Sequence, residues 1–304
     1  MSLLFDMFAR FRDILKSAYS YKEALERENL TQETVNLLRD KLKSSKVVPQ
    51  SLADKQLIFF LTTYKNDVDK SAALLESCYK LKRSAPEFFK DRDVDAKDIQ
   101  NCLDNQYYIT LPVTPDNHML IYHSLKNNDP NSYNFDSAAK TFIMMNEAYN
   151  YYHGPRPEVI YLFDLKGLSF RFLFKPSVST MRKGIKFLEG GMPYNIKAVH
   201  VFNTVSFFDW IIAIVKPLLN SELLEKLHLH HSDLDYDKFH EQYVPKTHLP
   251  KEYGGTLGTL EELQQQSRER LMNLKDYFIY EEQQSNFEYD QFVDENLYEI
   301  QNVD

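Results

Sequence analysis

The chain is 304 residues long, which is enough for one large domain or two smaller ones. Its net charge of −8 is concentrated at one end, because residues 261–304 hold 12 acidic and 3 basic side chains while the rest is near neutral. Without a basic face the protein is not expected to bind nucleic acid. The only two cysteines, Cys78 and Cys102, exclude a disulfide framework and a CxxC metal motif.

Several features predict a cytoplasmic protein. Two free thiols are typical of a reducing compartment. Charged residues, among them Asp6, Arg10 and Asp13, interrupt the apolar N-terminal stretch, which argues against a signal peptide. The nearest candidate for a membrane span, residues 210–215, is far too short. The 21 Phe and 20 Tyr indicate either a roomy apolar interior or simply an aromatic-rich core.

Residues 1–100 are predicted to form an all-helical subdomain. Phe8, Phe11 and Leu15 recur at helical spacing within a first amphipathic helix over residues 3–25. That helix packs on its own domain or, alternatively, lies at a membrane interface. Further helices are expected over residues 31–43, 54–61 and 70–81.

Residues 101–258 are predicted to form an α/β domain. Four short runs rich in aromatic and β-branched residues are typical of strands, and helical segments lie between the later ones. This alternation indicates βαβ units and a mainly parallel sheet. Strands are expected at residues 107–113, 119–125, 159–165 and 197–202, helices at 137–151, 178–188 and 205–216, and residues 223–230 fit either.

Residues 259–304 are predicted to form a C-terminal helix and an acidic tail. Thr259 and Glu262 fit a capping box at the start of a helix that continues to about Gln283. Residues 284–304 are expected to be loosely ordered, because acidic segments are usually solvated.

The sequence predicts neither an enzyme nor a cofactor site. A nucleophile elbow, a P-loop and a dinucleotide-binding glycine motif are all missing from it. His228, His230 and His231 could suggest a metal, but alternation on a strand puts only the first two on one face and no third ligand is evident. We therefore expect no catalytic residue and no metal.

Residues 206–216 form the most unusual segment of the chain. On a helix, Trp210, Ile211 and Ile214 share one face, and apolar side chains cover most of the remaining surface. A helix that is apolar nearly all round is normally buried, so a central core helix is one interpretation. The other is a lid over an apolar pocket, which would hinge or end at Pro217.

Four motifs in chain order carry a family resemblance. They are Phe163-Asp164-Leu165-Lys166-Gly167, His200-Val201-Phe202-Asn203, Lys216-Pro217-Leu218-Leu219 and Leu249-Pro250-Lys251-Glu252-Tyr253-Gly254-Gly255. In this order and at these spacings the set resembles the CRAL-TRIO family of lipid carriers. The resemblance implies a helical subdomain followed by an α/β domain whose sheet floors an apolar pocket. It also implies that the segment before the KPLL motif is the mobile gate of that pocket.

The resemblance also implies a set of ligand contacts. Alignment with family members that carry tocopherol places two polar pocket positions at Thr141 and Met145, so one hydroxyl remains and one position is apolar. The expected pocket wall consists of Tyr122, Thr141, Phe142, Met145, Val159, Phe163, Phe187, Leu188 and Val199, and the expected lid contributes Phe208, Ile211, Ile212 and Val215.

These departures from the family favour a small neutral hydrophobic ligand. Relatives that transfer phosphatidylinositol carry an arginine-rich stretch where this chain has Phe59 and Tyr64, and a buried phosphate needs charged partners. Tocopherol, retinoids and other terpenoids remain open. Exchange is expected at membranes, with Lys197 and Lys226 as possible phosphoinositide contacts.

The resemblance further implies a monomer. The alternative function is a lipid-regulated, non-transferring interaction module. It would recruit partners through its acidic C-terminal tail, where Phe287, Tyr289, Phe292 and Tyr298 stand among carboxylates.

Overall fold

The computed structural model describes residues 2–16, 18–204, 207–288 and 290. Seven helices precede the sheet in this part of the chain, as predicted for residues 1–100. The predicted helix over residues 3–25 is two helices, because the Ser20 side chain accepts a hydrogen bond from the Glu23 N–H and starts a new one. The helices are α1 (Ser2–Lys16), α2 (Tyr21–Glu28), α3 (Gln32–Leu42), α4 (Asp54–Thr63), α5 (Val68–Ser84), α6 (Pro86–Phe89) and α7 (Lys97–Asn105).

A five-stranded sheet forms the centre of the second half, in the order β1-β2-β3-β4-β5. β1 (Gln106–Leu111) runs antiparallel to β2 (Met119–Leu125), and β3 (Glu158–Asp164), β4 (Asn195–Phe202) and β5 (Leu227–Leu229) continue the sheet in parallel. The predicted mainly parallel sheet is confirmed. The ambiguous residues 223–230 hold both kinds of structure, since α11 (Ser221–Glu225) is followed directly by β5.

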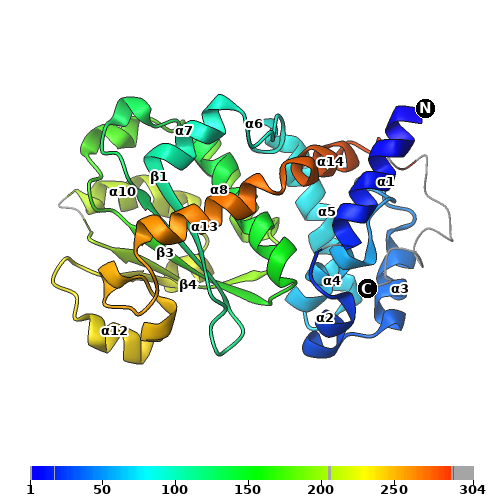
Figure 1. The fold of residues 1–304 in the computed structure, drawn as a ribbon, viewed down its shortest axis with the longest axis horizontal. Coiled ribbons are helices and arrows are strands. Elements are labelled where there is room, and N and C mark those ends of the chain that lie inside the picture. Colours follow the sequence, from blue (N-terminus) through cyan, green and yellow to red (C-terminus); the bar gives the residue numbers. More distant parts are fainter. Residues whose placement is uncertain (1, 17, 205–206, 289, 291–304) are drawn as a thin grey trace.

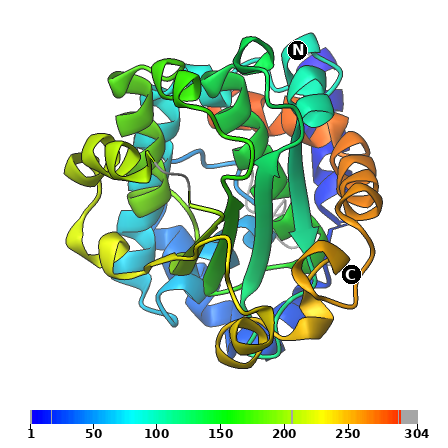
Figure 2. The ribbon, with the colours of Figure 1, turned by 90° about the vertical axis from the view of Figure 1, so that its left-hand side faces the viewer.

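Different elements cover the two faces of the sheet, as Figures 1 and 2 show. On one face lie α8 (Phe135–His153), α9 (Val178–Gly190) and α10 (Phe208–Val215), together with the short helices η1 (Pro130–Ser132), η2 (Phe170–Phe174) and η3 (Lys216–Leu218). The other face packs against α12 (Tyr236–Gln242), η4 (Lys246–His248), η5 (Lys251–Tyr253) and α13 (Leu260–Met272). Strand residues alternate between these two layers because successive side chains point to opposite faces.

Helix α13 protects the outer edge of β1. The Gln264 side-chain carbonyl accepts a hydrogen bond from the Tyr108 N–H at 2.8 Å, and the Ser267 hydroxyl accepts one from the Thr110 N–H at 3.1 Å. These side chains occupy donors that an edge strand would otherwise offer to another chain.

The capping box at Thr259 and Glu262 is confirmed, but the long helix predicted to follow it is interrupted. α13 ends at Met272, and α14 (Lys275–Ser285) starts after Leu274. The change of direction brings α14 against the N-terminal helix α1 (Figure 1). Phe11 of α1 lies 5.9 Å from Tyr277 between ring centroids, so α1 packs on its own protein as one of the two interpretations predicted.

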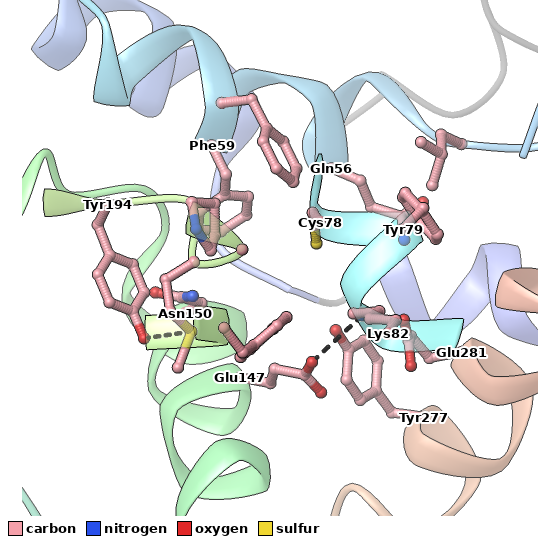
Figure 3. Close-up of a pocket in the computed structure, with 16 residues that line it drawn as sticks. Gln56, Phe59, Cys78, Tyr79, Lys82, Glu147, Asn150, Tyr194, Tyr277 and Glu281 are labelled. Carbon is pink, nitrogen blue, oxygen red and sulfur yellow. Dashed lines mark hydrogen bonds and ion pairs between the residues drawn. The ribbon is translucent and has the colours of Figure 1, made fainter. Parts of the chain in front are cut away.

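A buried ion cluster joins three distant segments, as the close-up in Figure 3 shows in part. Lys82 of α5 lies 2.6 Å from Glu281 of α14 and 3.4 Å from Glu147 of α8. Arg92, which is fully buried, pairs with the same two carboxylates. Burial alone would raise the pKa of Glu281, but Lys82 and Arg92 outweigh it and hold that pKa below its usual range. Two cations and two carboxylates thus neutralise one another where the helical region meets the α/β domain.

Candidate ligand-binding cavity

Two adjoining cavities lie on the face of the sheet that α8, α9 and α10 cover. Their volumes are about 230 and 340 Å³, and both are lined by His123 at the end of β2 and Phe163 at the end of β3. Carboxyl ends of parallel strands are where open α/β sheets bind ligands. The cavities also share Tyr133, Phe135, Met181 and Val215, so they adjoin along a common wall, and together they are called the apolar cavity below.

The cavity wall is apolar on nearly every side. Helix α8 contributes one stripe of side chains, spaced three and four residues apart, that includes Ala138, Ala139 and Phe142. Helix α9 contributes Met181, Gly184 and Leu188 from the facing side. An apolar cavity with few polar groups is the usual form of a small-molecule site.

Helix α10 closes the outer side of this space. Ile211, Ile214 and Val215 line the cavity, yet none of the residues of this helix is buried. Trp210 is 64% exposed and points away from the protein interior. The interpretation of this segment as a core helix is therefore wrong. As expected from Pro217, the α-helix ends at Val215, and a turn of 3₁₀-helix follows.

Three of the four motifs that carry the family resemblance meet at the carboxyl ends of β3 and β4. Asp164, at the end of β3, accepts hydrogen bonds from the Tyr253 hydroxyl and, at 2.9 Å, from the Asn203 side-chain amide. Tyr253 also shares a 2.6 Å hydrogen bond with the hydroxyl of Tyr122. Residues from the first, second and fourth motifs therefore fix the strand ends between which the cavity opens.

Two glycines, Gly254 and Gly255, determine the conformation of the loop that follows Tyr253. Gly254 has a φ of 70°, a left-handed conformation that glycine adopts without strain. A Cβ on Gly255 would lie 1.9 Å from the Leu249 carbonyl oxygen, so only glycine fits this close approach. The double glycine serves packing beneath the cavity rather than ligand contact.

Six of the thirteen predicted ligand contacts line the cavity: Phe142, Phe163, Phe187, Leu188, Ile211 and Val215. Tyr122 lies on the opposite face of the sheet, since it precedes His123 on the same strand. Thr141 and Met145 are buried on the side of α8 that faces away from the cavity, and the Thr141 hydroxyl donates to the Ser137 carbonyl at 2.8 Å. Four others also lie outside the lining: Val159, Val199, Phe208 and Ile212.

The sequence analysis missed His123, a polar side chain that lines both cavities. Its Nδ1 lies 2.9 Å from the backbone carbonyl oxygen of Tyr107 on the neighbouring strand. Burial lowers the pKa of His123 to about 4, so the ring is neutral at physiological pH. The only signal in the sequence is that a histidine interrupts the apolar and aromatic residues of β2, on the same face of the strand as Met119 and Ile121.

The two lysines predicted to contact phosphoinositides both face carboxylates. Lys197 lies 3.6 Å from Glu158, and Lys226 lies 2.6 Å from Glu222. Lys226 lines a small polar pocket of about 120 Å³ beside Glu189, outside the apolar cavity.

Other candidate features of the described residues carry no catalytic or metal geometry. His200 Nδ1 lies 3.0 Å from His230 Nε2, and within the described ranges no three His, Cys, Asp or Glu side chains are grouped so that they could hold a metal ion. Burial raises the pKa of Cys78 to about 12, which leaves its thiol unreactive. None of the described helices combines the length and apolar character needed to cross a bilayer. Most of the predicted acidic tail, residues 289 and 291–304, lies outside the described residues.

Comparisons with known proteins agree with this architecture. The CRAL/TRIO domain profile matches residues 104–255, half of the chain, and a Pinta-like UBA domain profile matches residues 27–99. The proteins called alpha-tocopherol transfer protein-like of Mus musculus and Homo sapiens are each 31% identical over 235 residues. Those matches cover 75% of this chain and 66% of each relative, so the chain spans just under two thirds of their length.

Among solved structures, the crystal structure of Sfh5 has a TM-score of 0.47 and 12% sequence identity, over 73% of this chain and 79% of that chain. The family assignment depends instead on the domain profile, which covers half of the chain in the segment that holds the sheet, the cavity and the motif residues. The chain therefore belongs to the CRAL-TRIO family of lipid-binding and lipid-transfer proteins.

Proposed function

We propose that this protein is a carrier that encloses one small neutral hydrophobic molecule and exchanges it at membranes. The observation that supports this proposal most directly is the apolar cavity at the strand ends, whose outer wall is the unburied apolar helix α10. In this proposal α10 is the lid, and the turn at Lys216–Leu218 is one end of its hinge.

The cargo is neutral because the cavity offers no charge to pair with it. Among the residues that line the two cavities, the one carboxylate is Asp164, which already accepts hydrogen bonds from Tyr253 and Asn203, and no Lys or Arg is present. Burying about 500 Å² of an apolar ligand at ~25 cal/mol/Å² corresponds to ~12 kcal/mol before the costs of association. Release on that scale is slow in water, so delivery requires the lid to open at a membrane.

The outer surface around α10 suits such contact. Phe170, Phe174 and Trp210 are 43%, 75% and 64% exposed, and the ring of Phe170 contacts the other two. Aromatic side chains favour the boundary between lipid headgroups and acyl chains. Residues 165–190, which contain η2 and α9, hold six basic residues and one acidic residue, and basic segments are attracted to anionic lipid surfaces.

The direct test is mass spectrometry of an organic extract of the purified protein, with Ile211→Asp and Trp210→Ser as paired variants. Ile211 faces the cavity, so an aspartate there should lower the amount of retained ligand at least tenfold. Trp210 faces outward, so Trp210→Ser should retain the ligand and transfer it to vesicles more slowly.

Each result has a defined meaning. One stoichiometric neutral lipid, lost in Ile211→Asp, supports the carrier. A phospholipid would show that the cargo class is wrong. A protein that is empty and also binds no retinoid, tocopherol or sterol after delipidation would contradict the carrier and favour a module that acts through its acidic tail.

A further inference from the structure

One polar side chain, His123, is part of the wall of both halves of the apolar cavity. It lies at the end of β2, where the rings of Tyr108, Phe142 and Phe163 surround it at centroid distances of 4.6, 6.0 and 6.0 Å. A histidine in such a place loses the hydration that favours its charged form. It therefore presents a neutral imidazole to whatever fills the cavity.

The hydrogen bond to Tyr107 determines which nitrogen carries the proton. A backbone carbonyl oxygen can only accept, so Nδ1, 2.9 Å away, must be the protonated nitrogen that donates to it. In a neutral imidazole the other nitrogen is then a pure acceptor. Across the residues described, Nε2 has no hydrogen-bond partner, so it remains available to a ligand.

The other polar side chains of the wall are Ser124, Asp164 and Tyr133, and the first two are already hydrogen-bonded. The Ser124 hydroxyl is hydrogen-bonded to the Tyr122 hydroxyl at 2.8 Å. Asp164 is held by Tyr253 and Asn203 in the network beneath the cavity. Tyr133 packs its ring on Phe172 at 5.4 Å, and burial together with the Cys102 and Asp136 side chains raises the pKa of its hydroxyl, which stays protonated.

We propose that His123 selects the cargo, and that its Nε2 accepts a hydrogen bond from a hydroxyl at the polar end of an otherwise apolar molecule. This inference depends on the carrier function proposed above and names its ligand class, a lipid alcohol. An aldehyde, an ester or a carboxylate has only acceptor atoms to offer, so it would leave Nε2 unpaired in an apolar site. Sites built to pair with a hydroxyl discriminate against analogues that lack it for this reason.

The test compares ligands that share one carbon skeleton and differ at the polar end. Retinol, retinal and retinoic acid form one such set, and hexadecanol, hexadecanal and hexadecanoate form a second. Dissociation constants are measured for the delipidated full chain and for His123→Phe, Tyr133→Phe and His118→Phe. His118 precedes the same strand at its other end and pairs with Glu158 at 3.1 Å, so it is the matched control for replacing a histidine by phenylalanine.

We expect the alcohol to bind roughly tenfold more tightly than the aldehyde on at least one skeleton, because a single hydrogen bond differs. His123→Phe should remove that preference while aldehyde binding persists, since phenylalanine fills the same space among aromatic rings. His118→Phe should keep the preference.

Three outcomes would overturn the proposal. Alcohols could bind no better than aldehydes, the preference could persist in His123→Phe, or it could disappear in Tyr133→Phe instead. Failure of all six compounds to bind would also overturn it. The carrier function is judged separately by the molecule recovered from the purified protein, and a recovered lipid without a hydroxyl or other donor would reject the role of His123 but leave the carrier standing.

Discussion

The two faces of the sheet differ in how completely they are packed. On the face covered by α12 and α13, Tyr122, Phe202 and Phe239 are each at most 1% exposed. The Tyr253 hydroxyl there is hydrogen-bonded to the Tyr122 hydroxyl and to the Asp164 carboxylate. On the other face, the ends of the same strands open into cavities of about 230 and 340 Å³ beneath a helix with no buried residue. Protein interiors are normally close-packed, so unfilled apolar space costs stability.

We infer that the two faces of the sheet have different roles. The packed face fixes the positions of the strand ends, and the open face leaves room for a ligand to supply the missing contacts. Since both faces use the same strands, truncations to alanine on the two sides test this difference in packing.

The largest expected effect is the loss of a ring from the packed face. Phe239→Ala should lower the free energy of unfolding by ~3–5 kcal/mol, because the side chain is 1% exposed and leaves a cavity. Ile211→Ala on the open face should cost less than ~1 kcal/mol, since Ile211 is only half-buried. Urea unfolding of the delipidated protein measures both, and equal losses would show that the two faces do not differ in packing.

The next effect is a pH dependence that comes from the packed face. Burial, with His228 and His230 nearby, lowers the pKa of His200 to about 3, whereas the unfolded chain has a value near 6.5. Between these values only the unfolded state binds the proton, so His200 leaves stability intact above pH 6.5 and reduces it as the pH falls. The reduction approaches ~1.4 kcal/mol per pH unit down to about pH 3.

A variant isolates this contribution from that of other histidines. His200→Phe should show a shallower loss of stability between pH 6.5 and 4 than the unmodified protein, in urea unfolding at a series of pH values. Parallel curves for the two proteins would mean that His200 is protonated without penalty and that its surroundings are not closely packed.

A smaller effect on stability than that of Phe239→Ala is expected for the tyrosine that joins the motifs. Tyr253→Phe removes the hydroxyl that donates to Asp164 and leaves the Tyr122 hydroxyl without that partner. The cost should be ~1–2 kcal/mol, typical of a buried hydrogen bond that is removed from one side. Unfolding in urea gives this value, and a stabilising effect would indicate that the network is strained rather than supportive.

Local sequence patterns predicted the parts of the fold that depend on local chemistry. Four strands and their helical connections followed from the alternation of β-branched and helical segments, and the capping box at Thr259 marked a true helix start. The breaks near Ser20 and Leu274 were not predicted. At the second of these, α14 turns to pack its aromatic side chains on α1, a contact between residues far apart in sequence.

The candidate site was predictable in outline only. The apolar character of residues 206–216 identified the segment that holds α10, and six aligned positions line the cavity. The other seven positions do not line the cavity. Thr141 misses it because another side of α8 faces the cavity. Tyr122 misses it because alternate strand residues point to opposite faces of the sheet. His123 was missed since an isolated histidine in a strand does not reveal that its neighbours leave a cavity beside it.

The weakest expected effect is on membrane binding, and it compares the exposed aromatic side chains Phe170, Phe174 and Trp210 with the two lysines as membrane contacts. Lys197 and Lys226 lie beside Glu158 and Glu222, so their charges are largely compensated, and exposed ion pairs contribute little. Lys197→Glu with Lys226→Glu should therefore change co-sedimentation with vesicles containing phosphatidylserine or phosphoinositide by less than about twofold, below the effect of Trp210→Ser. A larger loss specific to phosphoinositide vesicles would show instead that the lysines exchange their glutamate partners for phosphate, and that membrane binding extends beyond the aromatic surface around α10.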